Sequence, residues 1–170
     1  MDIKIVNCTL KHRAVLAELG ASTFYESYKD DNTEHDMQLY IENTYTIDKI
    51  QENLNNTNVI YFLAYTQDGE AGYVKLLLNQ FNPKLNGSCA ELEKIYVKQS
   101  FQRQGIAHQL LQHTINFCRE HNYKNLFLGV WQENEKALQF YAKEGFVSFD
   151  TRKFTLGERI CDDYMLNLAL

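Results

Sequence analysis

The sequence has almost no proline, since Pro83 is the only one in 170 residues. It also lacks any stretch rich in glycine and serine, and it contains no internal repeat. Linkers between domains are commonly rich in these residues, so their scarcity argues against a boundary between two domains. We therefore expect residues 1–170 to form a single domain, a length that allows one sizeable hydrophobic core.

Cysteine and histidine are too scattered to indicate a disulfide framework or a metal site. The four cysteines lie far apart, and none forms a CxxC pair. Helical zinc motifs place two histidines four residues apart, whereas His108 and His113 are separated by five. We expect four reduced thiols and no bound metal.

Neither a surplus of positive charge nor a long apolar run is present. The net charge is −5, whereas nucleic-acid-binding proteins usually carry a basic surplus. Apolar runs such as residues 76–78 are far shorter than the roughly 20 residues that cross a bilayer. The first ten residues, MDIKIVNCTL, lack the basic start and apolar run of a secretory signal. These features predict a cytoplasmic protein with no nucleic-acid or membrane partner.

Hydrophobic periodicity predicts a chain that mixes strands and helices. The first half begins with a predicted strand at 2–7. Three helices follow, at 11–28, from Thr33 onward and at 47–54, and then two strands at 58–65 and 71–79. The second half reads as strands at 89–97 and 125–131, helices at 104–121 and 133–143, and two strands around Gly157. Thr33 and Thr46 are the expected N-caps, and Gly145 is the expected left-handed stop. This order indicates an α/β fold with a mixed, mostly antiparallel sheet of about seven strands.

The segment after the strand at 89–97 combines a glycine with a helix start. It reads Gln102-Arg103-Gln104-Gly105-Ile106-Ala107. Gly105 lets backbone approach a ligand closely, and the free N–H groups of a first helical turn favour a pyrophosphate. Neither GxGxxG nor GxxxxGK[ST] occurs, which removes two common nucleotide-binding motifs. Alone, a glycine at a helix start also has a purely structural explanation.

Three segments together resemble the GNAT acetyltransferase superfamily. Gln102-x-x-Gly105-x-Ala107 is similar to its Q/R-x-x-G-x-G/A signature, residues 92–97 to its central strand, and residues 129–146 to its second conserved segment. Residues 23–25, 71–76 and 128–131 are also similar to bacterial PaiA-type spermine/spermidine acetyltransferases. The resemblance covers essentially the whole chain. It implies a GNAT domain with helices on both faces of the sheet, acetyl-CoA as donor and a primary amine as acceptor.

The resemblance also implies where the donor binds. The expected acetyl-CoA-binding residues are Ile95, Tyr96, Val97, Gln102, Arg103, Gln104, Gly105, Ile106, Ala107, His108, Asn134 and Tyr141. It implies that the central strand splays from its neighbour at 95–97, which frees N–H groups for the thioester carbonyl. Asn134 and Tyr141 are seven residues apart and so share one helical stripe. Tyr141 is the family-matched candidate for the acid that protonates the leaving thiolate, and a core aromatic is the alternative.

Acetyl transfer requires an unprotonated amine. An alkylammonium has a pKa of about 10.4, so its deprotonation at pH 7 costs on the order of 4–5 kcal/mol. A carboxylate near the acceptor can take that proton. Glu91 and Glu93, which alternate on the strand before the cofactor loop, are the candidates. Alternatively, both lie at a solvated sheet edge and pair with Lys94 or another cation.

The acceptor is expected to bind near the first two helices, at Tyr25, Asp30, Asp31 and Glu34. Clustered acidic groups attract a polycationic amine, although acidic residues are also favoured at helix starts. The sequence therefore predicts an acetyl-CoA-dependent N-acetyltransferase for a small-molecule amine, with a polyamine such as spermidine preferred. A GNAT enzyme acting on a protein amine or another small amine, and a non-catalytic acyl-CoA sensor, remain as alternatives. The expected oligomeric state is a monomer or a homodimer.

Overall fold

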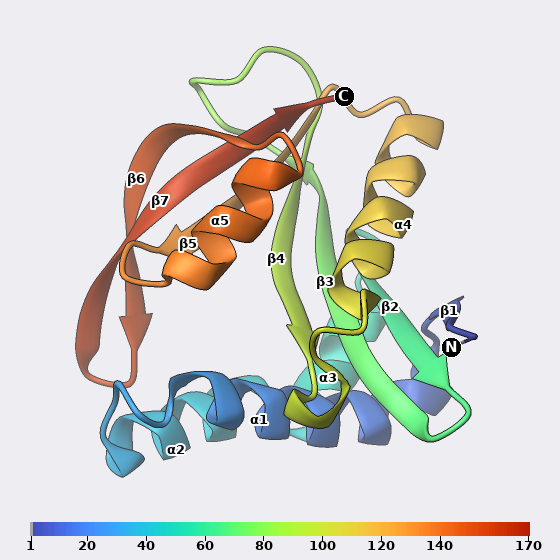
Figure 1. The fold of residues 1–170 in the computed structure, drawn as a ribbon, viewed down its shortest axis with the longest axis vertical. Helices are drawn as coiled ribbons and strands as arrows, with labels where there is room; N and C mark the ends of the chain where they lie inside the picture. The colour runs from blue at the N-terminus through green and yellow to red at the C-terminus, as the bar shows by residue number, and fades with distance from the viewer. Residues whose placement is uncertain (1) are drawn as a thin grey trace.

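The computed structural model describes residues 2–170 and contains one seven-stranded sheet (Figure 1). The strands are β1 (Lys4–Asn7), β2 (Val59–Thr66), β3 (Gly69–Gln80), β4 (Cys89–Val97), β5 (Asn125–Trp131), β6 (Val147–Leu156) and β7 (Arg159–Ala169). The helices are α1 (Arg13–Tyr28), α2 (Glu34–Thr44), α3 (Ile47–Asn55), α4 (Ile106–Glu120) and α5 (Glu135–Lys143), with short 3-10 turns η1 (Leu10–His12) and η2 (Gln99–Phe101). Across the sheet the strand order is β1-β2-β3-β4-β5-β7-β6.

Neighbouring strands are antiparallel except for β4 and β5. These two pair in parallel over three residue pairs only, from Cys89–Asn125 to Glu91–Phe127. Beyond that point β4 continues beside β3 and β5 continues beside β7. Figure 1 shows the two strands diverging, so the sheet is open in its middle.

Helices cover both faces of the sheet. On one face α4 and α5 pack against the core of β2 to β5, into which Leu110, Leu111 and Tyr141 project. On the other face α1, α2 and α3 form a second core around Leu16, Phe24 and other buried residues. The predicted fold class, a mixed and mostly antiparallel sheet with helices on both faces, is confirmed.

A β-bulge at Glu93 changes the direction of the side chains along β4. Leu92 and Lys94 pair with residues 76 and 75 of β3, so Glu93 has no partner of its own on that strand. Leu92 and Ile95 both pack on the α4 side, although an unbroken strand would turn them to opposite faces. A bulge increases twist and bends its strand, which helps to explain why β4 leaves β5 just here.

Several predicted helix ends are confirmed. The side-chain oxygens of Thr33 and Thr46 accept hydrogen bonds from the backbone N–H groups of Asp36 and Lys49 at 3.1 and 3.2 Å. Gly145 follows α5 with a φ of 90°, a left-handed value that favours glycine. These caps use local chemistry, which is why the sequence reveals them.

Two helices begin later than predicted. α4 begins at Ile106 because Arg103 and Gly105 have φ values of 62° and 80°, which are not helical. α5 begins at Glu135 because Asn134 is its N-cap. Asn134 therefore lies at the helix start and not on the helical stripe that the sequence predicted for it.

The β6–β7 hairpin folds back over the N-terminus of α2. The backbone N–H of Glu158 donates to Asp36 Oδ1 at 2.7 Å. Gly157, with a φ of +60°, lies so close that a Cβ there would be 2.4 Å from the same oxygen. Arg159 Nη1 donates to Asn32 Oδ1 at 3.1 Å. These contacts hold the hairpin beside the diverging ends of β4 and β5.

The four cysteines are free thiols, and Cys8 is the least buried of them. Burial raises the pKa of Cys8 and of Cys118 to about 12, so both remain protonated at neutral pH. Among residues 2–170, no helix is both long enough and apolar enough to cross a membrane.

Gly20 provides a test of how tightly α1 packs on the end of α2. A Cβ at Gly20 would lie 2.4 Å from Cδ1 of Tyr45, whose ring is buried and whose Oη is 3.3 Å from that of Tyr73. Alanine is the better helix former by about 1 kcal/mol. We nevertheless expect Gly20→Ala to lower the free energy of unfolding by ~1–3 kcal/mol, because overpacking outweighs propensity.

Chemical denaturation followed by circular dichroism measures this change. Ser22→Ala is the control, because Ser22 is exposed on the same helix, and it should change stability by less than about 0.5 kcal/mol. A Gly20→Ala protein as stable as the wild type would contradict the tight contact.

Candidate active site

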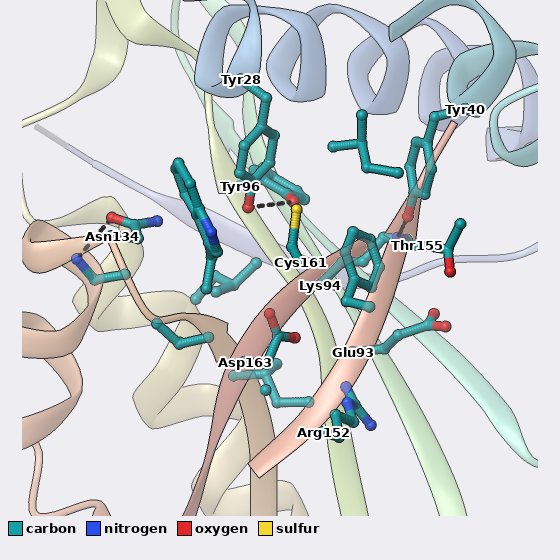
Figure 2. A pocket seen from close by; sticks show the side chains of 18 of the residues that line it. Tyr28, Tyr40, Glu93, Lys94, Tyr96, Asn134, Arg152, Thr155, Cys161 and Asp163 are labelled. Carbon is teal, nitrogen blue, oxygen red and sulfur yellow. Dashed lines mark hydrogen bonds between the residues drawn. The ribbon is translucent and has the colours of Figure 1, made fainter. Parts of the chain in front are cut away.

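A cavity of about 450 Å³ opens where β4 and β5 separate (Figure 2). Its wall is rich in aromatic side chains, namely Tyr28, Tyr40, Tyr96, Trp131, Tyr141 and Phe154. Charged side chains of both signs also line it, namely Glu91, Glu93, Asp163, Lys94, Arg152 and Lys153. Aromatic walls with a few converging polar groups are typical of a small-molecule site.

Residues 92–97 of β4 have no partner on β5 in the structure of residues 2–170. β3 pairs with Ile95, Tyr96 and Val97, whereas β5 pairs no further than Glu91 in the part of the chain that the structure describes. The splay expected at 95–97 is therefore confirmed. Of the exposed backbone groups, the carbonyl of Val97 accepts a hydrogen bond from Gln102 Nε2 at 3.2 Å. The remaining edge of β4 offers polar backbone groups to a ligand.

The loop before α4 presents backbone N–H groups at its tip. Gly105 is the N-cap of α4 and supplies no side chain, and the first-turn N–H groups have no partner within the helix. Gln102, Arg103 and Gln104 are exposed, while Ile106 is buried and anchors the helix start. A Cβ at Gly105 would meet no atom within 4 Å, so the space beside the tip is open.

His108 and Asn134, two predicted cofactor ligands, have partners within the chain. His108 Nδ1 lies 2.7 Å from Glu144 Oε1, and Gln112 Nε2 donates to the other oxygen of Glu144 at 2.8 Å. These contacts fix α4 against the end of α5. Asn134 Oδ1 accepts from the backbone N–H of Ala137 at 3.2 Å, and its side chain lines the cavity. Both residues thus position α5 beside the opening.

Tyr141 lies in the wall of the cavity and is only 6% exposed. Its ring packs beside those of Phe140 and Phe146, with centroids 5.2 and 5.4 Å away. Burial raises the pKa of the Tyr141 phenol well above its ordinary value. The phenol is therefore protonated at neutral pH and can donate a hydrogen bond or a proton into the cavity.

Glu91 and Glu93 both line the cavity, and both are ion-paired. Glu91 Oε1 lies 2.7 Å from Arg152 Nη1 on β6, and Glu93 Oε2 lies 2.6 Å from Lys75 Nζ on β3. The Glu91 side chain is 9% exposed and that of Glu93 is 32% exposed. The alternative of pairing with a cation is confirmed for both residues. Glu91 lies where β4 pairs with both β3 and β5, whereas Glu93 lies beyond the last β5 pair, on the open edge of β4 that faces the cavity.

Lys94 lines the cavity although the sequence did not indicate it as a site residue. Its Nζ donates to Tyr40 Oη at 2.8 Å and lies 5.3 and 5.5 Å from the ring centroids of Tyr40 and Tyr45. Burial lowers the pKa of the Lys94 ammonium, while the charges of Glu93 and Glu91 oppose that shift. The Lys94 ammonium thus packs against the rings of Tyr40 and Tyr45.

Asp163 is the second site residue that sequence reasoning missed. It is buried on β7, and Figure 2 shows it projecting into the cavity. It alternates with Cys161 and Met165, which are also buried, so a period-two pattern does place it on an inner face. Without the tertiary structure, that face could not be identified as the wall of a site.

The predicted acceptor residues lie outside the main cavity. Asp31 lines a smaller hollow of about 340 Å³ beside it, and Asp30 lines neither. Tyr25 Oη donates to Glu34 Oε2 at 2.9 Å, and neither residue lines either hollow. The geometry thus leaves Asp31 as the member of this group best placed to meet a ligand.

Comparison with known proteins identifies the family. Residues 21–146 match the acetyltransferase (GNAT) family. An uncharacterised N-acetyltransferase of Lactobacillus delbrueckii subsp. lactis is 31% identical over 169 residues, which cover 99% of this chain and 98% of that protein. N-alpha-acetyltransferase 50 of Danio rerio is 37% identical over 54 residues, or 31% of this chain and 32% of that one.

Solved structures share the fold. PaiA N-acetyltransferase from Thermoplasma acidophilum in complex with coenzyme A has a TM-score of 0.82 at 20% identity, with 100% of both chains covered. A probable acetyltransferase from Staphylococcus epidermidis has a TM-score of 0.77 at 21% identity, with 99% of each chain covered. The family match spans more than half of the sequence, and the Lactobacillus relative aligns over nearly all of it. The chain therefore belongs to the acetyltransferase (GNAT) family and is an N-acetyltransferase.

Proposed function

We propose that this protein moves an acetyl group from acetyl-CoA to a primary amine, and that a polyamine such as spermidine is its preferred acceptor. The observation that carries the proposal is the separation of β4 from β5, which opens a cavity lined by a buried phenol and by carboxylates. The start of α4, with its free N–H groups, follows directly from the end of β4.

The residues present fit coenzyme A. When bound, acetyl-CoA would supply the acetyl group as a reactive thioester. The N–H groups at the start of α4 and the charge of Arg103 suit its pyrophosphate. The unpaired edge of β4 at 95–97 suits its amide groups. In this proposal residues 95–97 and 102–107 hold the donor, while His108 and Asn134 act mainly by positioning α5.

Tyr141 is the proposed general acid. The sulfur that leaves carbon needs a proton, and the Tyr141 Oη–H lies in the cavity wall. Because burial raises the pKa of this phenol, it is a weaker acid than a thiol. Tyr141 therefore donates its proton to sulfur only while it accepts a proton from the attacking nitrogen, which becomes the amide nitrogen. The phenol thus passes a proton from nitrogen to sulfur.

Two features support a polyamine as acceptor. Aromatic rings line the cavity, and rings attract an ammonium group by about 0.5–1 kcal/mol at exposed sites. The smaller hollow shares Tyr28, Trp131 and Asn134 with the cavity. It adds three carboxylates, those of Asp31, Glu133 and Glu135, against one ammonium, that of Lys136. A long linear polycation can place one nitrogen in the cavity and another in this hollow.

Acceptor specificity is tested by thiol release from acetyl-CoA across a panel of amines. We expect spermidine to give a higher kcat/KM than a monoamine of similar length or a lysine-containing peptide, because only the polyamine reaches both hollows. Raising the ionic strength should weaken the spermidine reaction more than that of the monoamine. A preference for the peptide would favour a protein acceptor, and no release with any amine would favour an acyl-CoA sensor.

Asp31 and Asp30 make a matched pair for the same assay. Asp31→Asn should raise the KM for spermidine about 2–5-fold, the effect of one exposed ion pair, and leave the monoamine unaffected. Asp30→Asn should change neither KM, because Asp30 lines neither hollow. Equal effects of both variants would contradict binding in the smaller hollow.

Tyr141→Phe tests the proposed acid. It removes only the hydroxyl, so we expect kcat to fall about 10²-fold or more while the KM for acetyl-CoA changes little. Tyr164→Phe is the control, because Tyr164 is 37% exposed on β7 and does not line the cavity. Unchanged turnover of Tyr141→Phe would remove this residue from the mechanism.

Gly105→Ala tests the donor site, with Gly69→Ala as its control. Both glycines have positive φ, and a Cβ at either would meet no atom within 4 Å, so both substitutions should cost about 1–2 kcal/mol of strain. Only Gly105→Ala should raise the KM for acetyl-CoA, because it distorts the start of α4. Steady-state kinetics and thermal unfolding separate the two effects, and equal KM values would contradict the assignment.

A further inference from the structure

Three carboxylates line the cavity, and two of them are already paired with a cation. Glu91 lies 2.7 Å from Arg152, and Glu93 lies 2.6 Å from Lys75. For Asp163, in contrast, the structure of residues 2–170 shows neither a hydrogen bond nor a cation within 4.0 Å of the carboxylate. Burying a carboxylate without such a partner is costly, so its presence calls for a functional explanation.

The position of Asp163 depends on the glycine beside it. Asp163 is 6% exposed and lies opposite Trp131 of β5 and Arg152 of β6. A Cβ at Gly129 would lie 2.9 Å from Asp163 Oδ2 and 2.7 Å from Arg152 Nη2. Because Gly129 has no side chain, both charged groups fit over β5, and Figure 2 shows Asp163 projecting from there into the cavity.

The groups that interact with this carboxylate come from four other elements and from its own strand, namely Arg152 on β6, Glu91 on β4, Tyr28 on α1, Tyr40 on α2, and Asp162 and Cys161 on β7. Burial has the largest effect and raises the pKa of Asp163. Arg152 lowers that pKa, and the two neighbouring carboxylates raise it again, with a net result of about 6.

We propose that Asp163 is the catalytic residue that removes the proton from the substrate ammonium. This inference rests on the proposed acetyltransferase reaction and deepens it. Glu91 and Glu93, the two predicted candidates, each hold a cation, whereas the carboxylate of Asp163 is free and lines the same cavity as Tyr141. Glu91 then acts as a positioning residue, because it holds Arg152 beside Asp163.

The step balances without any further reactant. A proton passes from the ammonium nitrogen to a carboxylate oxygen of Asp163, and the nitrogen keeps the electron pair. That pair forms the bond to the thioester carbonyl carbon, while the carbon–sulfur bond breaks and its electrons leave on sulfur. Sulfur takes a proton from Tyr141 Oη, which recovers one from the acylated nitrogen. Asp163 releases its proton to solvent, so ammonium and thioester become amide, thiol and one proton.

The environment of Asp163 suits this task. A carboxylate with a pKa of about 6 takes a proton from an ammonium at a smaller free-energy cost than one at the ordinary 3.8. At pH 7 roughly nine-tenths of it is still ionised and ready to accept. Burial thus makes the carboxylate a stronger base while leaving it charged at neutral pH.

The dependence of kcat/KM on pH tests the proposal in the full chain, with acetyl-CoA and the best amine of the panel. For the wild type, log kcat/KM should rise with unit slope below pH 6 and stay level up to the amine pKa of about 10. For Asp163→Asn only the free amine reacts. Its kcat/KM should therefore be about 10²-fold or more lower at pH 7, and its log kcat/KM should keep rising through pH 9.

Asp162→Asn is the matched control, since the exposed side chain of Asp162 pairs with Lys153 and is not part of the cavity wall. Because the charge of Asp162 raises the pKa of Asp163, its removal should move the rise in log kcat/KM to a slightly lower pH, while the plateau at neutral pH stays that of the wild type. The proposal is overturned if Asp163→Asn retains the wild-type plateau, or if Asp162→Asn loses it equally. Failure of the wild type to acetylate any amine would instead contradict the proposed function, so the two failures are distinct.

Thermal unfolding of the same variants shows that lost activity is not lost folding. Because the pKa of Asp163 is raised from 3.8 to about 6 on folding, its ionised form destabilises the folded state above pH 6. Asp163→Asn should therefore unfold at the same or a higher temperature than the wild type at pH 8, and the gap should narrow as the pH falls towards 4. A variant that unfolds at a lower temperature at pH 8 would contradict the unpaired, buried carboxylate.

Discussion

The short parallel pairing of β4 and β5 is the constraint on which the active site depends. Three residue pairs hold the two halves of the sheet together, and beyond them each strand follows its antiparallel neighbour. If the pairing continued, the polar edge of β4 would be satisfied by β5 and no cavity would form between them. The bulge at Glu93 contributes to this separation, because a bulge bends and twists its strand.

Charge inside the cavity is arranged by the strands that flank the opening. Lys75 on β3 and Arg152 on β6 each hold one glutamate of β4, so two carboxylates are neutralised in place. Asp163 stays free between them over Gly129, and its burial is an energetic cost that a purely structural residue would not repay. Enzymes often carry such locally unfavourable groups where their chemistry occurs.

The sequence predicted the elements well where the signals are local. The strands at 89–97 and 125–131 have the bounds that the apolar patterns predicted, and the caps at Thr33, Thr46 and Gly145 are where their chemistry indicated. The helix starts were less accurate. A left-handed conformation at Arg103, which is not a glycine, cannot be seen in a propensity pattern, and it delays α4.

The sequence by itself determined the family and the fold class and predicted the segments proposed to face the donor, because each of these follows from patterns within a few consecutive residues. Only the tertiary structure decided the ion pairs of Glu91 and Glu93, the exclusion of Tyr25, Asp30 and Glu34 from the cavity, and the place of Asp163. The physical reason is that a carboxylate's role depends on which cations and how much water lie within a few ångströms. Those neighbours come from strands that are distant along the chain and meet only when the sheet forms.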